Sequence, residues 1–388
     1  THMLRASWLR TQDAARGDRL PKRGDELPAE ARIGVAELRE IHAASECKYG
    51  PYWPHAALPV IALSHFWRTK EHPDPDGETL ALVVKALNER WRDFEGNKVR
   101  DLGVLIDWSG LYQAPRTAAQ QPVFTEGLKG INQWYAHRGT TVWLVTAGAD
   151  RVQGLGYKDK GWTSFEYALA MMIKLSNESG LSDWPQVLDL GKEGDAQSQL
   201  TRPAPAEPLA FFGGHAYGDK TYTNGADRDA IVAPKFRETT FELLAGVDEL
   251  NYNKLGWGAA EAVQLSVVLP LGAKLTKLQL GFNKVGAVGA AALAEWLKSG
   301  PPLALLYLGG NQIGDEGAAA LAGALEANAE LKTLYLQDNQ IGDVGAAALA
   351  GALEANKALE TLYLKYNRIH AKAKAALRRA ARPSLYLG

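Results

Sequence analysis

The chain has 388 residues, which exceeds one ordinary domain and predicts two. Its 43 lysine and arginine residues balance 44 aspartate and glutamate residues, so bulk charge favours neither nucleic acid nor an anionic membrane as a partner. Apolar residues make up 46%, which argues against disorder, and the single cysteine, Cys47, excludes an intramolecular disulfide framework. We therefore expect a cytoplasmic protein that binds neither nucleic acid nor membrane.

The first 30 residues are charged and rich in proline and glycine, and they begin with "THM", which resembles a tag remnant. We expect residues 1–30 to form a flexible segment. From residue 59 onward apolar runs alternate with helical patterns, which predicts an α/β domain over residues 31–200. Residues 201–245 are expected to connect this domain to a repetitive region over residues 246–388.

Three apolar runs, at residues 59–67, 102–110 and 140–148, are continuous rather than alternating. Continuous runs indicate strands buried on both faces, and hence a parallel sheet with helices on each side. Helical patterns follow these runs at residues 78–91, 124–139 and 163–176, and further candidate strands lie at 184–191 and 208–214.

Ligands of such sheets bind outside the carboxyl ends of the strands. Polar and tryptophan side chains follow each apolar run, and a tryptophan-rich cleft with few polar groups suits a flat ring such as a nucleobase or nicotinamide. The candidate substrate-binding residues are Ser64, His65, Phe66, Trp67, Asp107, Trp108, Ser109, Tyr112 and Trp162.

Glu166 admits two interpretations. Thr163 and Glu166 have the spacing of a capping box, in which the threonine caps the helix and the glutamate reaches back to the cap amide. Alternatively, Glu166 follows the third strand, a glycine-containing loop and Trp162, where a carboxylate could stabilise an oxocarbenium-like centre or bind a ribose hydroxyl. The local sequence favours the helix cap, whereas the position in the predicted fold favours a catalytic or ribose-binding carboxylate.

The stretch "HPDPDG", residues 72–77, contains possible metal ligands, but it lacks the further ligands of a calcium loop. The simpler interpretation is a turn stiffened by proline, with Asp76 as the N-cap of the helix that begins near Glu78. We therefore expect no metal site. The chain also lacks a phosphate-binding loop, a dinucleotide-binding glycine motif and a nucleophile elbow.

A pattern L-x-x-L-x-L-x-x-N recurs in the last third, with asparagines spaced 28 residues apart. The leucines should point inward from a short strand, the asparagine should satisfy backbone groups at the turn, and a small-residue helix should return the chain. A degenerate earlier copy is expected to end at Asn253. The four clear copies end at Asn283, Asn311, Asn339 and Asn367.

One strand position of these repeats is expected to line an exposed, concave surface. It holds Gln279, Tyr307, Tyr335 and Tyr363. These side chains could bind a protein partner, or they could form a tyrosine ladder that stabilises the repeats themselves. The sequence leaves both interpretations open.

The repeats resemble leucine-rich repeats of the ribonuclease-inhibitor class. The earlier domain resembles TIR domains and the related fungal heterokaryon-incompatibility (HET) domains over residues 59–176. Three segments carry this resemblance: "VIALSHFW", "LGVLIDWSGLYQ" and "GWTSFEYAL". The resemblance implies a flavodoxin-like fold, with Glu166 in the place of the catalytic glutamate that supports cleavage of the nicotinamide–ribose bond of NAD. It also implies that Ser64, Phe66 and Trp67, together with Asp107, Trp108 and Tyr112, lie near the nucleotide.

The resulting hypothesis is an intracellular defence or cell-death protein. Its first domain would hydrolyse NAD, a substrate rather than a bound cofactor, and would self-associate when active, while the repeats bind a protein partner. Nicotinamide would stack on Trp67, Trp108 or Trp162. The alternatives are a non-enzymatic adaptor, or another nucleotide or sugar hydrolase that uses His65, Asp107 and Glu166.

Overall fold

The computed structural model divides the chain into two compact units, described separately below. The first comprises residues 1–200 and 212–239, and the second comprises residues 201–211 and 240–388, so the division falls inside helix α9, Ala233–Gly246. The structure describes residues 2–45, 57–69, 71–148, 156–174, 184, 186–191, 202–205, 220, 222, 228–380 and 385–386. The candidate strand at 208–214 lies outside these residues.

The first unit is built on a six-stranded sheet with the order β2-β1-β4-β3-β5-β6. Strands β4, β3, β5 and β6 are parallel, whereas β1 pairs antiparallel with both β2 and β4. Every residue of the four parallel strands is buried, which is why their sequences are continuous apolar runs. The strands are β1 Met3–Arg5, β2 Arg32–Ile33, β3 Val60–His65, β4 Gly103–Leu105, β5 Thr141–Val145 and β6 Val187–Asp189.

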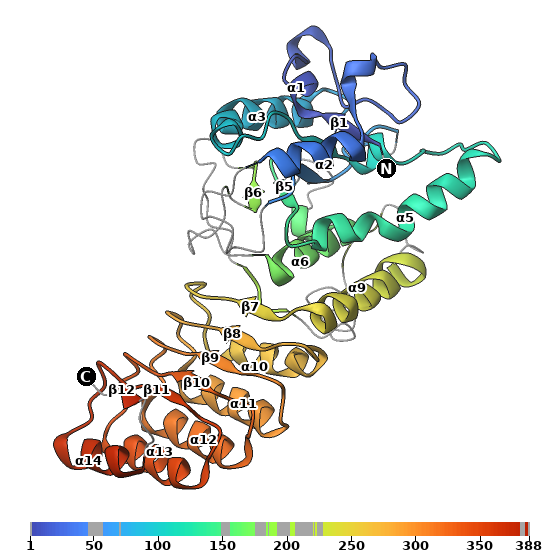
Figure 1. The fold of residues 1–388 in the computed structure, drawn as a ribbon. Helices are drawn as coiled ribbons and strands as arrows, with labels where there is room; N and C mark the ends of the chain where they lie inside the picture. Colours follow the sequence, from blue (N-terminus) through green and yellow to red (C-terminus); the bar gives the residue numbers. More distant parts are fainter. Residues whose placement is uncertain are drawn as a thin grey trace. The chain divides into compact units, whose positions relative to one another are not determined.

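The order of the parallel strands reverses at β3, since β4 lies on one side of it and β5 on the other. Such a reversal opens a crevice at the carboxyl ends of the strands. Figure 1 shows α3 on one side of this sheet and α5 with α6 on the other. The helices are α1 Ala6–Leu9, α2 Val35–Ala44, α3 Glu78–Gly96, α4 Asp107–Gly110, α5 Gln120–Ala136 and α6 Gly161–Ile173.

The beginning of the chain differs from the flexible segment predicted for residues 1–30. Met3 and Leu4 of β1 are 2% and 3% exposed, and Leu9 and Leu20 are fully buried. Arg5 is held by Glu37 at 2.6 Å and by Asp101 at 3.2 Å. The prediction weighted charge and proline content, but Met3, Leu4, Ala6, Leu9 and Leu20 are buried in the core and hold the segment in place.

The second unit is a solenoid with a fully parallel sheet in the order β12-β11-β10-β9-β8-β7. Neighbouring strands pair residues 28 apart from β7 to β11, for example Leu306 with Leu334. The strands are β7 Glu249–Asn251, β8 Lys277–Gln279, β9 Leu305–Tyr307, β10 Thr333–Tyr335, β11 Thr361–Tyr363 and β12 Leu385–Tyr386. The helices are α10 Ala259–Val268, α11 Gly286–Lys298, α12 Gly314–Ala327, α13 Asp343–Ala355 and α14 Ala371–Ala380 (Figure 1).

Buried asparagines join successive repeats through their side chains. Asn339 Nδ2 donates to the carbonyl of Leu308 in the preceding repeat at 2.8 Å, and its Oδ1 accepts from the amide of Asn311 at 2.9 Å. Asn367 makes the corresponding bonds to Leu336 at 2.8 Å and to the amide of Asn339 at 3.0 Å. These bonds satisfy backbone groups that leave the strand at each turn, as the repeat pattern predicts.

In the first repeat the predicted asparagine position was wrong by two residues. Strand β7 pairs Leu250 with Leu278, so Leu255, rather than Asn253, occupies the asparagine position of that repeat. The amide of Leu255 still donates to Asn283 Oδ1 of the next repeat, at 2.9 Å. In the described part of the chain β7 is the edge strand of the sheet, so no preceding repeat there needs the bonds that an asparagine would make.

Candidate functional site

Strand β3 and helix α6 bring Ser64 and Glu166 together, although they are far apart in the sequence. Ser64 is fully buried at the end of β3, and its Oγ donates to Glu166 Oε2 at 2.5 Å. Glu166 is only partly exposed on the second turn of α6. The acid therefore faces the carboxyl end of the central strand, at the point where the strand order reverses.

The capping-box interpretation of Thr163 and Glu166 is wrong. Helix α6 begins at Gly161, with Lys160 at the N-cap position, and no side chain caps it. Thr163 Oγ1 donates to the carbonyls of Tyr157 and Lys160 instead of accepting from an amide of the helix. Since Glu166 points to Ser64, its orientation is set by tertiary contact and not by the helix start.

Two tyrosines complete the surroundings of Glu166. The hydroxyl of Tyr157 hydrogen bonds to Ser64 Oγ, and because the Ser64 proton goes to Glu166, Tyr157 is the donor of that bond. Tyr135 donates to the carbonyl of Leu63 at 3.1 Å, and its hydroxyl lies close enough to Glu166 to influence the pKa of that acid. Burial, followed by the charge of Glu166, raises the pKa of both tyrosines, so they remain protonated donors near neutral pH.

Burial raises the pKa of Glu166 well above 4.5, and the negative charge of Asp107 raises it further. The hydrogen bond from Ser64 and the nearby Tyr135 hydroxyl lower the pKa of Glu166, because they favour the carboxylate, but they are the smaller effects. A carboxyl group with these properties holds its proton to a higher pH than an exposed glutamate does, and it loses that proton more readily when a cation arrives beside it. Perturbed acids of this kind are common at functional sites.

The pH dependence of folding follows from this shift. Because the pKa of Glu166 is higher in the folded state, its stabilising contribution is complete below about pH 4.5 and is lost as the pH rises through the folded-state value. We expect the free energy of unfolding of the wild type to fall relative to Glu166→Gln over that interval, by at most about 1.4 kcal/mol per pH unit. Urea unfolding of both proteins at several pH values measures the difference. A difference that is constant with pH would contradict the shift, and Glu126→Gln, an exposed pair partner of Lys129, is the control.

Asp107 lies near enough to Glu166 to raise the pKa of that acid, and His65 lies near Asp107. His65 Nε2 is 3.6 Å from Asp107 Oδ1, which is too long for a hydrogen bond. This nitrogen is buried and has no hydrogen-bond partner in the described part of the chain. The structure thus brings together Ser64, His65, Asp107, Tyr135, Tyr157 and Glu166, which we name the Glu166 cluster.

Among the aromatic candidates, Trp67 and Trp162 are partly exposed, whereas Phe66 is buried. Trp67 and Trp108 meet edge to face at 5.2 Å beside Asp107, and Trp67 keeps part of its surface exposed. Trp162 packs at 6.0 Å from Phe165 and is also partly exposed. Phe66, in contrast, is 2% exposed and has the Lys160 ammonium 5.2 Å from its ring centre, so it is placed as a core residue.

Ser109 and Tyr112 do not join the Glu166 cluster. The Ser109 hydroxyl donates to the carbonyl of Pro21 at 2.5 Å, and the ring of Tyr112 lies 4.1 Å beneath the Arg23 guanidinium. The two residues line a separate cavity near β1. The short helix α4 turns the chain after Asp107, so residues adjacent in sequence face different sites.

Sequence reasoning missed Tyr135 and Tyr157 as members of the site. Tyr135 stood in the apolar face of a predicted helix, where a tyrosine is normally a core residue. Tyr157 belongs to the loop before α6 and has no motif of its own. Only the position of that loop after the third strand could have drawn attention to Tyr157.

The "HPDPDG" stretch caps a helix, although through a different aspartate than predicted. Asp74, which is fully buried, accepts from the amides of Thr79 at 2.8 Å and Leu80 at 3.1 Å. Asp76 makes no cap, because Gly77 occupies the N-cap position. Among the described residues, no group of three or more histidine, cysteine, aspartate or glutamate side chains is placed to hold a metal ion.

The strand position that was predicted to be exposed carries a tyrosine ladder, which we define as Tyr307, Tyr335, Tyr363 and Tyr386; the first three are half-buried and Tyr386 is exposed. Tyr335 and Tyr363 stack at 4.3 Å, Tyr363 and Tyr386 stack at 4.4 Å, and Tyr307 meets Tyr335 edge to face at 5.1 Å. Gln279 occupies the same position in β8 but is held by Glu249 at 2.6 Å. The sequence signal for Tyr386 was the "LYL" of the last residues, which matches the strands of the earlier repeats.

A model of the leucine-rich repeat family matches residues 273–294, 303–322 and 327–350. Among solved structures, the actin-binding site 2 of leiomodin-1 is 21% identical with a TM-score of 0.32, over 37% of this chain and 86% of that one. The tropomodulin C-terminal domain of Caenorhabditis elegans is 17% identical with a TM-score of 0.32, over 37% and 89%.

An internalin from Listeria monocytogenes is 17% identical with a TM-score of 0.29, over 67% of this chain and 56% of that one. At these TM-scores the structural likenesses add no argument. No curated protein matches the chain. None of the described helices is long and apolar enough to cross a membrane. The family model and the 28-residue strand register together confirm the predicted repeats, and the region from residue 273 to 350 is a leucine-rich repeat array.

Proposed function

We propose that the first unit is a TIR/HET-like domain that cleaves the N-glycosidic bond of NAD and releases nicotinamide, with Glu166 as the catalytic acid group. One observation carries the proposal: Glu166 is held by Ser64 at the carboxyl end of β3, where the strand order reverses, and takes no part in capping its helix. Ligands of open parallel sheets bind at such a point. The resemblance adds cytoplasmic defence or cell death as the proposed setting.

The topology supports this proposal. The four parallel strands have the order β4-β3-β5-β6, in which the first in sequence is central. This is the order of flavodoxin-like sheets. The three segments that carry the resemblance contribute the end of β3, the end of β4 and the start of α6, and each supplies at least one member of the Glu166 cluster.

The chemistry of the cluster suits an N-glycosidic bond to a cationic ring. Departure of nicotinamide takes the positive charge off the ring and leaves it developing on the ribose, as in the oxocarbenium-like transition states of glycoside hydrolysis. The raised pKa of Glu166 is lowered again when the cationic nicotinamide lies beside it, so the substrate itself favours the carboxylate. Ser64 orients that carboxylate, and Trp67 or Trp162 offers a partly exposed ring for stacking.

The test compares NAD with NADH. The concentrated full chain, at about 100 µM to promote self-association, is incubated with each nucleotide and nicotinamide release is followed by chromatography. We expect release from NAD and none from NADH, because the reduced ring carries no positive charge and is a poor leaving group. Absence of release from NAD at every protein concentration would contradict the proposal.

A second candidate function is protein binding by the solenoid. Leucine-rich repeats commonly use their concave face for binding, and the tyrosine ladder presents aromatic rings there, with Tyr386 42% exposed. Tyrosine is also favoured in protein interfaces because it contributes a large contact area and a hydroxyl group. In this case the first unit would be an adaptor, the tyrosine ladder would bind the protein partner, and no nicotinamide would be released from NAD.

A further inference from the structure

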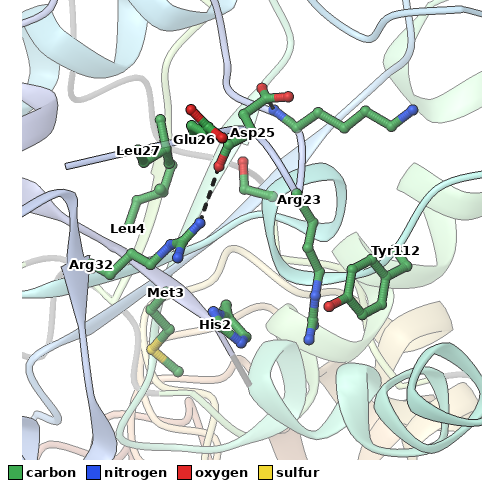
Figure 2. A pocket seen from close by; sticks show the side chains of 12 residues that line it. His2, Met3, Leu4, Arg23, Asp25, Glu26, Leu27, Arg32 and Tyr112 are labelled. Atoms are coloured by element: carbon green, nitrogen blue, oxygen red, sulfur yellow. Dashed lines mark hydrogen bonds between the residues drawn. The ribbon is translucent and has the colours of Figure 1, made fainter. Parts of the chain in front are cut away.

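A cavity beside β1 is separate from the Glu166 cluster and has a volume of about 450 Å³. Figure 2 shows it from close by, with the side chains of Arg23 and Arg32 on either side of His2. We name it the arginine pocket. It is lined by His2, Met3, Leu4, Lys22, Arg23, Gly24, Asp25, Glu26, Leu27, Arg32, Ser109 and Tyr112.

The guanidinium group of Arg23 is held by two contacts, but one of its N–H groups has no acceptor in the described part of the chain. Its Nη1 donates to the carbonyl of Gly110, and its guanidinium lies 4.1 Å from the ring centre of Tyr112. Its Nε is buried and has no hydrogen-bond partner in the described part of the chain. A buried guanidinium donor without an acceptor is unfavourable, and an anion in the cavity would supply that acceptor.

Arg32 is oriented by backbone contacts alone. Its Nη2 donates to the carbonyl of Asp25 at 3.2 Å, the bond drawn in Figure 2. The nearby Arg5 differs, because Glu37 and Asp101 neutralise it at 2.6 Å and 3.2 Å. Within the described residues, no carboxylate forms an ion pair with Lys22, Arg23 or Arg32.

The lining contains three cationic side chains against two acids, so its net charge is positive. Asp25 accepts from the backbone amide of Lys22 at 2.7 Å, and Glu26 is exposed. The positive charges of the lining act on His2. Burial lowers the pKa of His2, and the charges of Arg23 and Arg32 lower it further. The two guanidinium groups therefore act on the same point of the cavity.

We propose that the arginine pocket binds a small phosphate monoester. Two guanidinium groups suit the phosphate oxygens, because arginine donates paired N–H groups in a planar fork. Met3, Leu4 and Leu27 provide apolar walls for the organic part, and the volume falls in the range of small-molecule sites. This site would be independent of Glu166.

The experiment is isothermal titration calorimetry of the full chain at constant ionic strength, with ribose 5-phosphate and inorganic phosphate as separate probes. We expect saturable binding of ribose 5-phosphate that weakens at least about tenfold in Arg23→Gln and in Arg32→Gln, since each loses a charge-assisted contact. Arg39→Gln, which removes an exposed arginine outside the pocket on α2, should bind like the wild type.

The two probes separate the sources of the phosphate. Tighter binding of ribose 5-phosphate than of inorganic phosphate supports an ester ligand, whereas equal binding supports an anion site but overturns the ester. No saturable binding of either probe up to about 10 mM, or equal weakening in Arg39→Gln, overturns the pocket as a phosphate site. If Arg23→Gln unfolds, Arg32→Gln alone decides, because its side chain makes only the exposed bond to Asp25.

Discussion

Replacing Glu166 with glutamine should reduce nicotinamide release from NAD by about 10²- to 10⁴-fold, the usual contribution of a positioned acid or base group. Glutamine has nearly the same shape, and its amide oxygen can still accept from Ser64 Oγ, so the fold should survive. It cannot carry the negative charge that would stabilise the developing cation on the ribose. Initial rates of nicotinamide release at matched protein concentration measure the effect.

Two further variants make this result specific. Glu126→Gln removes an exposed glutamate that pairs with Lys129 on α5, and it should keep full activity. Ser64→Ala should retain part of the activity, since it removes a group that orients Glu166 but not the carboxylate itself. Full activity in a folded Glu166→Gln protein would remove Glu166 from the mechanism and leave the cluster as a buried structural network.

Replacing Asn339 with alanine should lower the stability of the solenoid by about 3–5 kcal/mol, because several buried backbone groups lose their partners at once. Asn339 is fully buried, and its side chain serves the carbonyls of Leu308 and Gln337 at 2.8 and 3.2 Å. It also accepts from the amides of Asn311 and Ile313 at 2.9 and 3.4 Å. Native-state hydrogen exchange measures this loss for the repeats separately from the first unit.

The variant Asn339→Asp separates the contribution of the hydrogen bonds that Asn339 donates from that of the bonds it accepts. Asn339→Asp keeps the acceptor for the amides of Asn311 and Ile313 but loses both donated bonds, so protection should be lost around Leu308. Glu326→Ala, an exposed change on α12, is the control and should leave exchange unchanged. Unaltered exchange in Asn339→Ala would mean that water replaces the asparagine without cost.

The repeats could be predicted from the sequence because their determinants are local and periodic. Each leucine and asparagine makes the same contacts as its counterpart 28 residues away, so four copies of one pattern reinforce one another. The first and last strands were harder, because an edge repeat lacks one neighbour. Leu255 takes the asparagine position at one edge, and β12 is reduced to Leu385 and Tyr386 at the other.

The candidate site was predicted in part. Placement at the strand ends put Ser64, His65, Asp107 and Glu166 in one region, and the structure brings their side chains together. The spacing of Thr163 and Glu166 suggested a capping box. In the structure Glu166 accepts a hydrogen bond from Ser64 instead, and Thr163 donates to the carbonyl of Tyr157. Ser109 and Tyr112 were misplaced because a short helix reverses the direction of the chain.

The bonds between repeats have a consequence for how this solenoid can change over generations. Residues 311–328 and 339–356 are identical except at Glu316 and Val344, and the side chains of Asn339 and Asn367 make the same bonds one repeat apart. Unequal recombination between the two coding segments would insert or delete one whole repeat, and each remaining asparagine would still find an equivalent partner. The array can therefore lengthen or shorten in steps of about 4.8 Å, one strand spacing at a time, without passing through a sequence that cannot fold.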